Sequence, residues 1–542
     1  MRRSLRTAGA LILLSSSSTF AFSSSALHSV SSLRSAVGRP IPGASRALGT
    51  WSSRARSAPV MNLFGSVSKG ISNAMRGGAG GAASGGGRPY SPRSAAFVDG
   101  APSWETLKEE VLKTDVGKRL AEEKALREMG GGPPHTMNKM RLFGQKEEDV
   151  RVVLYRDAAA WCPYCQKVWL LLEEKQLPYR VEKINMRSYG EKPDWFMKKM
   201  PRGLLPVVEI DGKMVSESIV IMQMIDQLAP SLNPMLPSDQ AELARASKLM
   251  NLERDLFGAW CGFTFQPGGF GRKFFEDTLS QVDKALQETS GPWILGGDRP
   301  SLVDFQYVSH VERMVPSVLY WKGLKMRGDP RWAGITAWLE AFEKRPAYVA
   351  TKSDYYTHIK DIPPQYGPGD ARGMQENEDI ASQLDGRKGW TLPLEPLSAT
   401  SLEPEIAENL VGGEEAARHE ALFSITSNGA AVARFCARAA GEDVGEWYRQ
   451  GGSSRSELAD PLAAPNLDVV PDVDACLRYI AHALLVGPEA AALTMPNEGG
   501  ASSATLRTAL DYLRKRVGVP RDMSFPAARQ FRAHIAWMLQ AL

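Results

Sequence analysis

The feature that most constrains this chain is a short β-rich run followed directly by a two-cysteine loop and an apolar helical run. Residues 151–156 read RVVLYR, residues 157–162 read DAAAWC, and residues 163–176 read PYCQKVWLLLEEKQ. Pro163 suits the first turn of a helix, where its missing N–H needs no partner. We therefore predict a strand, a loop and a helix, with Cys162 at the start of the helix.

This position predicts different chemistry for the two cysteines. Cys162 would face unpaired backbone N–H groups and the positive end of the helix dipole, which favour a thiolate over a thiol. Cys165 would lie one turn further along, close enough to attack a mixed disulfide on Cys162. We interpret Cys162 as a nucleophile and Cys165 as a candidate resolving thiol.

Plainer interpretations of the pair remain open. Structural zinc usually takes four ligands, and the sequence offers no second Cys or His pair at ligand spacing, so we expect no metal site. A buried structural pair is another interpretation, since Cys is common in protein cores. A bound iron–sulfur cluster is a third, and it would give the protein visible colour.

The sequence after the cysteines continues in an α/β order. Apolar strand patterns at 179–185, 204–211 and 213–218 are separated by a polar helical stretch and followed by a helix from Ser218. Two strands joined by a crossover helix should be parallel. Asp211-Gly212 is a favoured two-residue turn, so the last two strands should form a hairpin. The order β-α-β-α-β-β-α predicts a thioredoxin-like layer.

On these motifs, residues 149–230 resemble the N-terminal domain of a cysteine-type glutathione transferase. The stretches CPYC, GLLPVVEID, SES and EKPDWF carry the resemblance. The domain is similar to the omega class, with a glutaredoxin-style CPYC centre. The resemblance implies glutathione as co-substrate and a cis bond between Leu205 and Pro206, facing Cys162.

The resemblance also implies the residues that bind glutathione. Lys192 would meet the glycyl carboxylate, and the main chain of Leu205 would pair with the cysteinyl part. Glu217 would meet the ammonium group, while Ser218 and the helix that follows would hold the γ-glutamyl carboxylate. We add Pro163 and Pro206, which flank the thiol. Glu217 as a helix-capping carboxylate and Lys192 as a solvated surface residue are the plainer alternatives.

Residues 237–358 have a helical pattern and resemble the all-α second domain of these transferases. Ser301 and Asp304 form a capping-box-like start to an apolar helix. An aromatic segment nearby could line a pocket for a second substrate, although such residues more often belong to a core. Its members are Trp260, Phe263, Phe265 and Phe270.

The first 98 residues contain no Asp or Glu and have the composition of a targeting sequence. We interpret 1–21 as a signal peptide cleaved after Ala21, and 22–98 as a transit peptide or disordered segment. A signal peptide followed by Phe22 and a basic stretch resembles the bipartite leader of complex algal plastids. Ordinary secretion or a disordered basic tail are the alternatives.

The remaining segments are expected to be accessory. Residues 99–148 should form an amphipathic helix at 103–129 and a linker leading into the first domain. Residues 359–403 are rich in Pro, Gly and acidic residues and indicate a second linker. Residues 404–542 predict an α-helical extension, whose basic stretches would bind an anion or the transferase body, or form a solvated face. An extension of this kind resembles the iota class of photosynthetic organisms.

Composition limits the function classes. Five cysteines in 542 residues are too few for a disulfide scaffold, and no apolar run reaches the roughly 20 residues of a membrane span. Twelve of the 65 Lys and Arg residues precede Asp99, which leaves 53 against 61 acidic residues. The mature chain is therefore acidic and has no general nucleic-acid signature.

We therefore expect a glutathione-dependent thiol transferase or reductase, acting on mixed disulfides or dehydroascorbate-like acceptors through Cys162. Its partners would be glutathione and a small-molecule or protein disulfide. A homodimer is compatible with the resemblance, while the sequence leaves the oligomeric state open. The alternatives are a non-catalytic ligand carrier or plastid interaction protein, and a dithiol reductase independent of glutathione.

Overall fold

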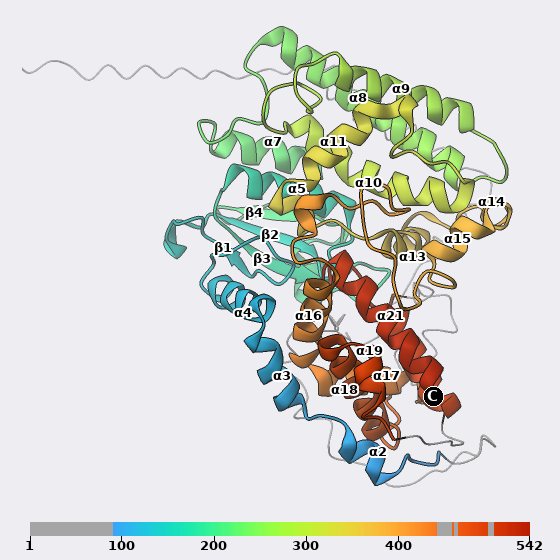
Figure 1. Cartoon of the computed structure of the whole chain (residues 1–542). Helices are drawn as coiled ribbons and strands as arrows, with labels where there is room; N and C mark the ends of the chain where they lie inside the picture. Colours follow the sequence, from blue (N-terminus) through green and yellow to red (C-terminus); the bar gives the residue numbers. More distant parts are fainter. Residues whose placement is uncertain (1–89, 442–457, 460–463, 497–502) are drawn as a thin grey trace, which may run out of the picture. The chain divides into compact units, whose positions relative to one another are not determined.

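A five-stranded mixed sheet carries the cysteine loop in the computed structural model (Figure 1). The structure describes residues 90–441, 458–459, 464–496 and 503–542. The expected signal peptide and most of the 22–98 segment lie outside these residues. The strand order is β1-β3-β2-β4-β5. The strands are β1 Met140–Arg141, β2 Val152–Asp157, β3 Tyr179–Ile184, β4 Val207–Ile210 and β5 Lys213–Ser216.

The pairing of the strands confirms the predicted topology. β2 and β3 are parallel, and β4 runs antiparallel to both β2 and β5. Asp211 and Gly212 have φ angles of 49° and 80°. Both central turn residues therefore have positive φ, as a tight hairpin turn requires. β1 was not expected from the sequence, and it adds an antiparallel edge strand to β3.

Three helices belong to this thioredoxin-like layer: α5 Pro163–Lys175, α6 Asp194–Lys199 and α7 Ser218–Leu228. α5 contacts β2, α7 and a helix of the following domain. This position between two layers explains why α5 has buried residues along almost its full length, several of them polar or charged.

An all-α domain follows, and its central helix is almost entirely buried. Its elements are α8 Gln240–Thr264, α9 Arg272–Gln287, α10 Leu302–Lys322, η2 Pro330–Trp332, α11 Ala333–Glu343 and α12 Pro346–Val349. The predicted capping box is present at the start of α10, because Ser301 and Asp304 each accept a hydrogen bond from the other's backbone N–H. The sheet and these helices share one hydrophobic core.

The 359–403 segment, expected to be a linker, contains helices instead. α13 Tyr355–Tyr366, α14 Ala371–Glu376 and α15 Glu378–Leu384 occupy its first half. Asp354 caps α13 by accepting a hydrogen bond from the backbone N–H of Thr357. Ile359 and Ile362 are buried in the main core. This burial outweighs the poor helix propensity of Pro363 and Pro364 near the end of α13.

The N-terminal helices pack with the C-terminal extension. They are α2 Ala95–Gly100, α3 Trp104–Lys113 and α4 Asp115–Glu128, followed by η1 Glu147–Asp149. Phe97, Leu107 and Val111 lie in one core with buried residues of the extension, among them Ala421 and Met538. The predicted helix at 103–129 is divided at Thr114, whose hydroxyl caps α4. The first residues of α2 fall inside the 22–98 segment that was expected to be leader. One of them, Phe97, packs against Tyr479 of the extension.

The extension itself is helical, as predicted. Its elements are η3 Ala407–Asn409, α16 Gly413–Thr426, α17 Gly429–Ala437, η4 Arg438–Ala440, α18 Val470–Val486, α19 Pro488–Ala492, α20 Ser503–Arg514 and α21 Phe525–Ala541. In the described part of the chain, none of the helices has the length and apolar content that crossing a bilayer requires.

Candidate active site

Strand register brings the predicted site segments to one edge of the sheet. Asp157 ends β2 opposite Ile184 of β3, so the loops that follow these parallel strands begin together. β4 starts at Val207, which pairs with both Tyr155 and Ser216. The 205–206 turn and the 217–218 segment therefore lie at the same edge as the loop that leads to Cys162.

Cys162 occupies the predicted helix start. It is the N-cap residue of α5, Pro163 is the first helical residue, and the Cys162 side chain makes no capping hydrogen bond. The thiol therefore adjoins the positive end of the helix without being used as a cap. Cys162 is 6% exposed, so its sulfur is largely enclosed by neighbouring groups.

Cys165 lies beside Cys162 but in a less favourable place for a thiolate. Burial raises the pKa of Cys165 well above its usual range, and its hydrogen bond with Cys162 raises it further. The side chains of Asp157, Cys162 and Cys165 place their ligand atoms within 4.8 Å of one another. These are three potential metal ligands, one short of the usual structural zinc set.

The thiol loop, residues 157–162, is held from within and from the second domain. The backbone N–H of Trp161 donates to Asp157 Oδ2 at 2.6 Å, and Arg313 Nη2 of α10 donates to the Trp161 carbonyl at 2.6 Å. Ala160 has a φ of 65°, an uncommon conformation for a residue with a Cβ. The backbone leading into Cys162 is therefore strained locally and fixed by its hydrogen bonds.

The predicted cis bond is present between Leu205 and Pro206. Lys192, expected at the glycyl carboxylate, donates to the carbonyl of Asn185 at 2.5 Å. Burial lowers the pKa of the Lys192 ammonium, while the thiols of Cys165 and Cys162 oppose this effect. Lys192 is thus a partly buried cation on the thiol side of the sheet, rather than a solvated surface lysine.

Glu217 and Ser218 lie at the start of α7. Glu217 is the N-cap residue of α7 with a φ of 72°, but its carboxylate makes no capping hydrogen bond, in contrast to the capping carboxylate considered above. Its carboxylate lies 3.4 Å from Arg202 Nη1 in an ion pair of two exposed side chains. An exposed carboxylate next to a helix N-terminus leaves both groups accessible to a ligand.

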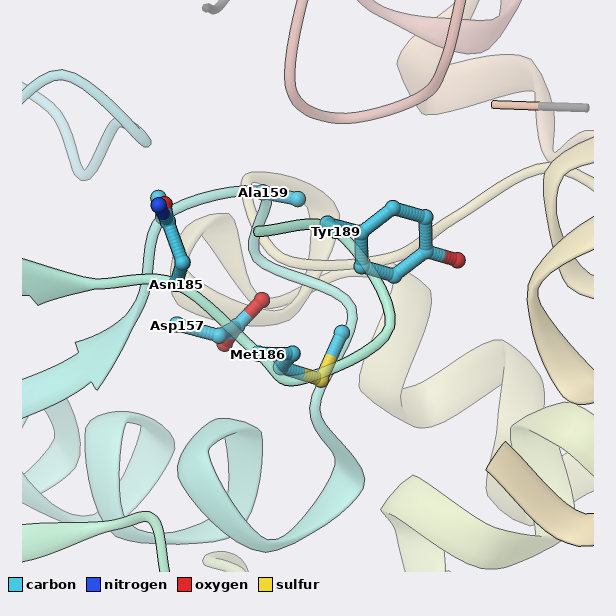
Figure 2. A pocket seen from close by; sticks show the side chains of 6 residues that line it. Asp157, Ala159, Asn185, Met186 and Tyr189 are labelled. Atoms are coloured by element: carbon cyan, nitrogen blue, oxygen red, sulfur yellow. The ribbon is translucent and has the colours of Figure 1, made fainter. Parts of the chain in front are cut away.

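A narrow hollow lies against the thiol loop. Figure 2 shows, as sticks, the side chains of lining residues that include Asp157, Ala159, Asn185, Met186 and Tyr189. The Tyr189 hydroxyl donates to Asp361 Oδ1 of α13. Burial raises the pKa of Asp361 to about 7. A buried carboxyl group from the segment expected to be a linker therefore holds the hydroxyl of Tyr189, one of the residues that line the hollow.

The aromatic segment is mainly core. Trp260 and Phe263 are fully buried, and the Trp260 indole N–H donates to Ser317 Oγ at 2.9 Å. Phe265 packs on the same core, whereas Phe270 is exposed. Trp260 and Phe263 thus support the fold rather than the wall of an open pocket.

Sequence reasoning missed Trp161, Arg313 and Asp361 as residues of the site. Trp161 directly precedes Cys162 in the sequence, and this adjacency could have identified it as a residue of the site. Arg313 directly follows Glu312 in the sequence, and two adjacent charged residues inside a largely apolar helix pattern indicate a buried polar network. Asp361 carried no signal, because nothing local places α13 beside the thiol loop.

A thioredoxin-like sheet domain with a cysteine at a helix start, followed by an all-α domain, defines a cysteine-type transferase architecture. The profile "Glutathione S-transferase, N-terminal domain" matches residues 161–228. Glutathione S-transferase DHAR2 of Arabidopsis thaliana is 30% identical over 199 residues, covering 36% of this chain and 86% of the relative.

Two further relatives agree. Glutathione S-transferase DHAR3, chloroplastic, of Arabidopsis thaliana is 26% identical, over 36% of this chain and 69% of the relative. Glutathione S-transferase omega-1 of Mus musculus is 28% identical, over 29% of this chain and 64% of the relative. The chain belongs to the glutathione S-transferase family and is accordingly an enzyme with glutathione as its co-substrate.

Proposed function

We propose that this enzyme is a glutathione-dependent thiol transferase and reductase with Cys162 as nucleophile. The observation that carries the proposal is the position of Cys162 at the N-terminus of α5, at the sheet edge shared with the Leu205–Pro206 turn and Glu217. The relatives named as dehydroascorbate reductase-type and omega transferases support this assignment.

The reaction needs two thiol–disulfide exchanges. The Cys162 thiolate attacks the glutathione sulfur of a mixed disulfide, which forms a Cys162–glutathione disulfide and releases the acceptor thiolate, protonated by solvent. A second glutathione thiolate then attacks the glutathione sulfur. This step restores the Cys162 thiolate and yields oxidised glutathione. With dehydroascorbate-type acceptors, two molecules of reduced glutathione supply the two electrons and become one molecule of oxidised glutathione.

The residues around the thiol match the charges of glutathione. In this proposal Lys192 binds the glycyl carboxylate and the main chain of Leu205 pairs with the cysteinyl part. Glu217 meets the ammonium group, and Ser218 with the start of α7 binds the γ-glutamyl carboxylate. Pro163 and Pro206 shape the two sides of the thiol.

The decisive experiment replaces the proposed nucleophile. Cys162→Ser should abolish glutathione-dependent reduction of a mixed disulfide and of dehydroascorbate in the full chain. Cys261→Ser is the matched control, because Cys261 lies on α8 and outside the thiol loop. Full activity of Cys162→Ser would overturn the proposal, and glutathione binding without any turnover in the unaltered protein would favour the ligand-carrier alternative.

Cys165 separates a monothiol from a dithiol mechanism. Because burial disfavours its thiolate, we propose that glutathione, rather than Cys165, completes turnover on glutathionylated substrates. Cys165→Ser should then keep most of the glutathione-dependent rate. A dithiol reductase independent of glutathione would instead lose its activity in Cys165→Ser and show no dependence on glutathione concentration.

We also propose a plastid location through a bipartite leader, with residues 1–21 as signal peptide and 22–98 as transit segment. The leader composition and a chloroplastic relative support it. A fluorescent protein fused behind residues 1–98 should enter the complex plastid of an alga. Secretion of the fusion protein would contradict this location.

The finer class and assembly are further proposals. The CPYC centre and the helical extension support an iota-like subclass with an omega-like first domain. Light scattering of the purified chain tests the homodimer directly, since a homodimer would have about twice the chain mass of 59.3 kDa.

A further inference from the structure

The chain between α20 and α21 contacts the residue that precedes the nucleophile. The indole N–H of Trp161 donates to the carbonyl of Val519 at 2.9 Å. The guanidinium of Arg521 lies over the Trp161 ring, 4.7 Å from its centroid. Trp161 is fully buried. The C-terminal extension therefore encloses the side chain that adjoins Cys162.

Gly518 permits this contact because it has no side chain. A Cβ placed on Gly518 would lie 2.5 Å from Cζ2 and 3.2 Å from Cη2 of Trp161. Two carbon atoms attract one another at about 3.5–4.0 Å, so a separation of 2.5 Å would be strongly repulsive. Gly518 is not in the left-handed backbone region, so an alanine there would strain the contact and not its own backbone.

The segment is held firmly enough to act on Trp161. The backbone N–H of Gly518 donates to Asp522 Oδ2 at 2.8 Å, and that of Val519 donates to Thr357 Oγ1 at 3.0 Å. The buried Arg532 of α21 donates to the carbonyl of Val517 at 2.6 Å and to Asp354 Oδ2 at 2.5 Å. The segment is therefore tied both to the extension and to α13.

We propose that residues 517–522 of the C-terminal extension are a positioning element for the nucleophile, acting through Trp161. Asp157 holds the Trp161 N–H, Arg313 holds its carbonyl, and the extension holds its indole. Since Cys162 is the next residue, any displacement of Trp161 moves the thiol relative to the first N–H groups of α5. The extension thus tunes the reactivity of the thiol without contacting the substrate.

The test introduces the missing methyl group in the full chain. Gly518→Ala should slow alkylation of Cys162 by iodoacetamide roughly three- to tenfold near neutral pH, as expected from a weakened helix-terminus effect. Gly258→Ala is the matched control, because a Cβ at this exposed position of α8 meets nothing within 4 Å. Mass spectrometry reads the alkylation at each cysteine.

A smaller aromatic side chain at position 161 provides the second part of the test. Trp161→Phe removes the indole N–H and the ring atoms that the new methyl group would meet. It should itself slow alkylation, whereas Trp338→Phe, which loses an equivalent buried hydrogen bond to Asp304, should not. In the Trp161→Phe background, Gly518→Ala should cause no further loss, because the two changes act through one contact.

The outcomes decide the inference separately from the proposed function. Unchanged alkylation in folded Gly518→Ala, or an equal loss in both backgrounds, would overturn it. If Gly518→Ala does not fold, equal alkylation of the Trp161→Phe and Trp338→Phe proteins would overturn it instead. The inference deepens the proposed function, since both concern Cys162. Alkylation is measured without glutathione. If Cys162→Ser kept full activity and the proposed function were wrong, the alkylation rates would still show whether the extension positions Cys162.

Discussion

Arg313 on α10 donates a hydrogen bond of 2.6 Å to the main-chain carbonyl of Trp161, the residue before the proposed nucleophile. The same guanidinium donates to Gln166 Oε1 at 2.9 Å and to the carbonyl of Ser309. One buried side chain of the all-α domain thus fixes both the loop before Cys162 and the first turns of the helix after it. The geometry of the thiol depends on the second domain through this residue.

Arg313→Lys should therefore lower turnover more than it lowers stability. Lysine keeps the charge, but its single ammonium nitrogen cannot take the two separate positions from which Arg313 Nη1 and Nη2 reach three acceptors. We expect roughly a tenfold or greater fall in kcat with a disulfide substrate, because small displacements of reacting groups are costly. The control is Arg327→Lys, which keeps the charge but loses the paired hydrogen bonds to the buried carboxylate of Glu343, away from the site. Equal kcat losses in the two folded variants would contradict this role.

The five thiols should differ sharply in reactivity. Cys165, Cys436 and Cys476 are at most 1% exposed, and burial raises the pKa of Cys476 to about 12. Burial also raises the pKa of Cys261 to about 12. We expect iodoacetamide to label Cys162 at least about tenfold faster than the others near neutral pH. In urea the five rates should converge; native labelling of Cys436 as fast as Cys162 would contradict the nucleophile assignment.

Asp361 should make stability depend on pH. Burial raises its pKa to about 7 in the folded protein, against about 3.9 for an unfolded Asp. The folded state therefore binds this proton more tightly, and the stabilising effect of the proton, at most roughly 4 kcal/mol, is lost as pH rises through about 7. Asp361→Asn has no carboxyl group at this position and therefore lacks this pH-dependent contribution to stability.

The measurement compares free energies of unfolding of the two proteins between about pH 5 and pH 8. The unaltered protein should lose stability relative to Asp361→Asn as pH rises across this range. Asp298→Asn, at an exposed position, corrects for the loss of a negative charge. A difference between the two proteins that stays constant with pH would show that Asp361 does not titrate there.

The N-terminal helices should contribute to the stability of the C-terminal extension. Leu107 is 1% exposed and belongs to the core that the extension forms. Leu107→Ala should lower the free energy of unfolding by about 2–5 kcal/mol, the usual effect of truncating a buried leucine. Leu126→Ala, at a position 44% exposed, should change it by about 0.5 kcal/mol or less. Denaturant titration of both variants measures the difference.

Local interactions made much of this protein predictable from sequence. The start of α5 at Pro163, the turn at Asp211 and Gly212, and the Ser301–Asp304 capping box each depend on residues within a few positions of one another. The parallel pairing of β2 and β3 follows from a general rule of chain connection. Cys162 could be proposed as the nucleophile from sequence because its position depends on a helix start, which is also set by nearby residues.

Tertiary packing decided what local pattern does not encode. α13 forms through Pro363 and Pro364 because its other residues are buried, and Phe97 is ordered because it meets Tyr479 nearly four hundred residues away. Trp161 is held by Arg313 and Val519, which are distant in sequence. Such contacts depend on which surfaces meet after folding, and the residues that make them carry no periodic or spacing signal. The position of Cys162 at a helix start, on which its proposed role depends, was therefore determined by the local sequence, whereas the enclosure of its thiol was decided by the tertiary structure.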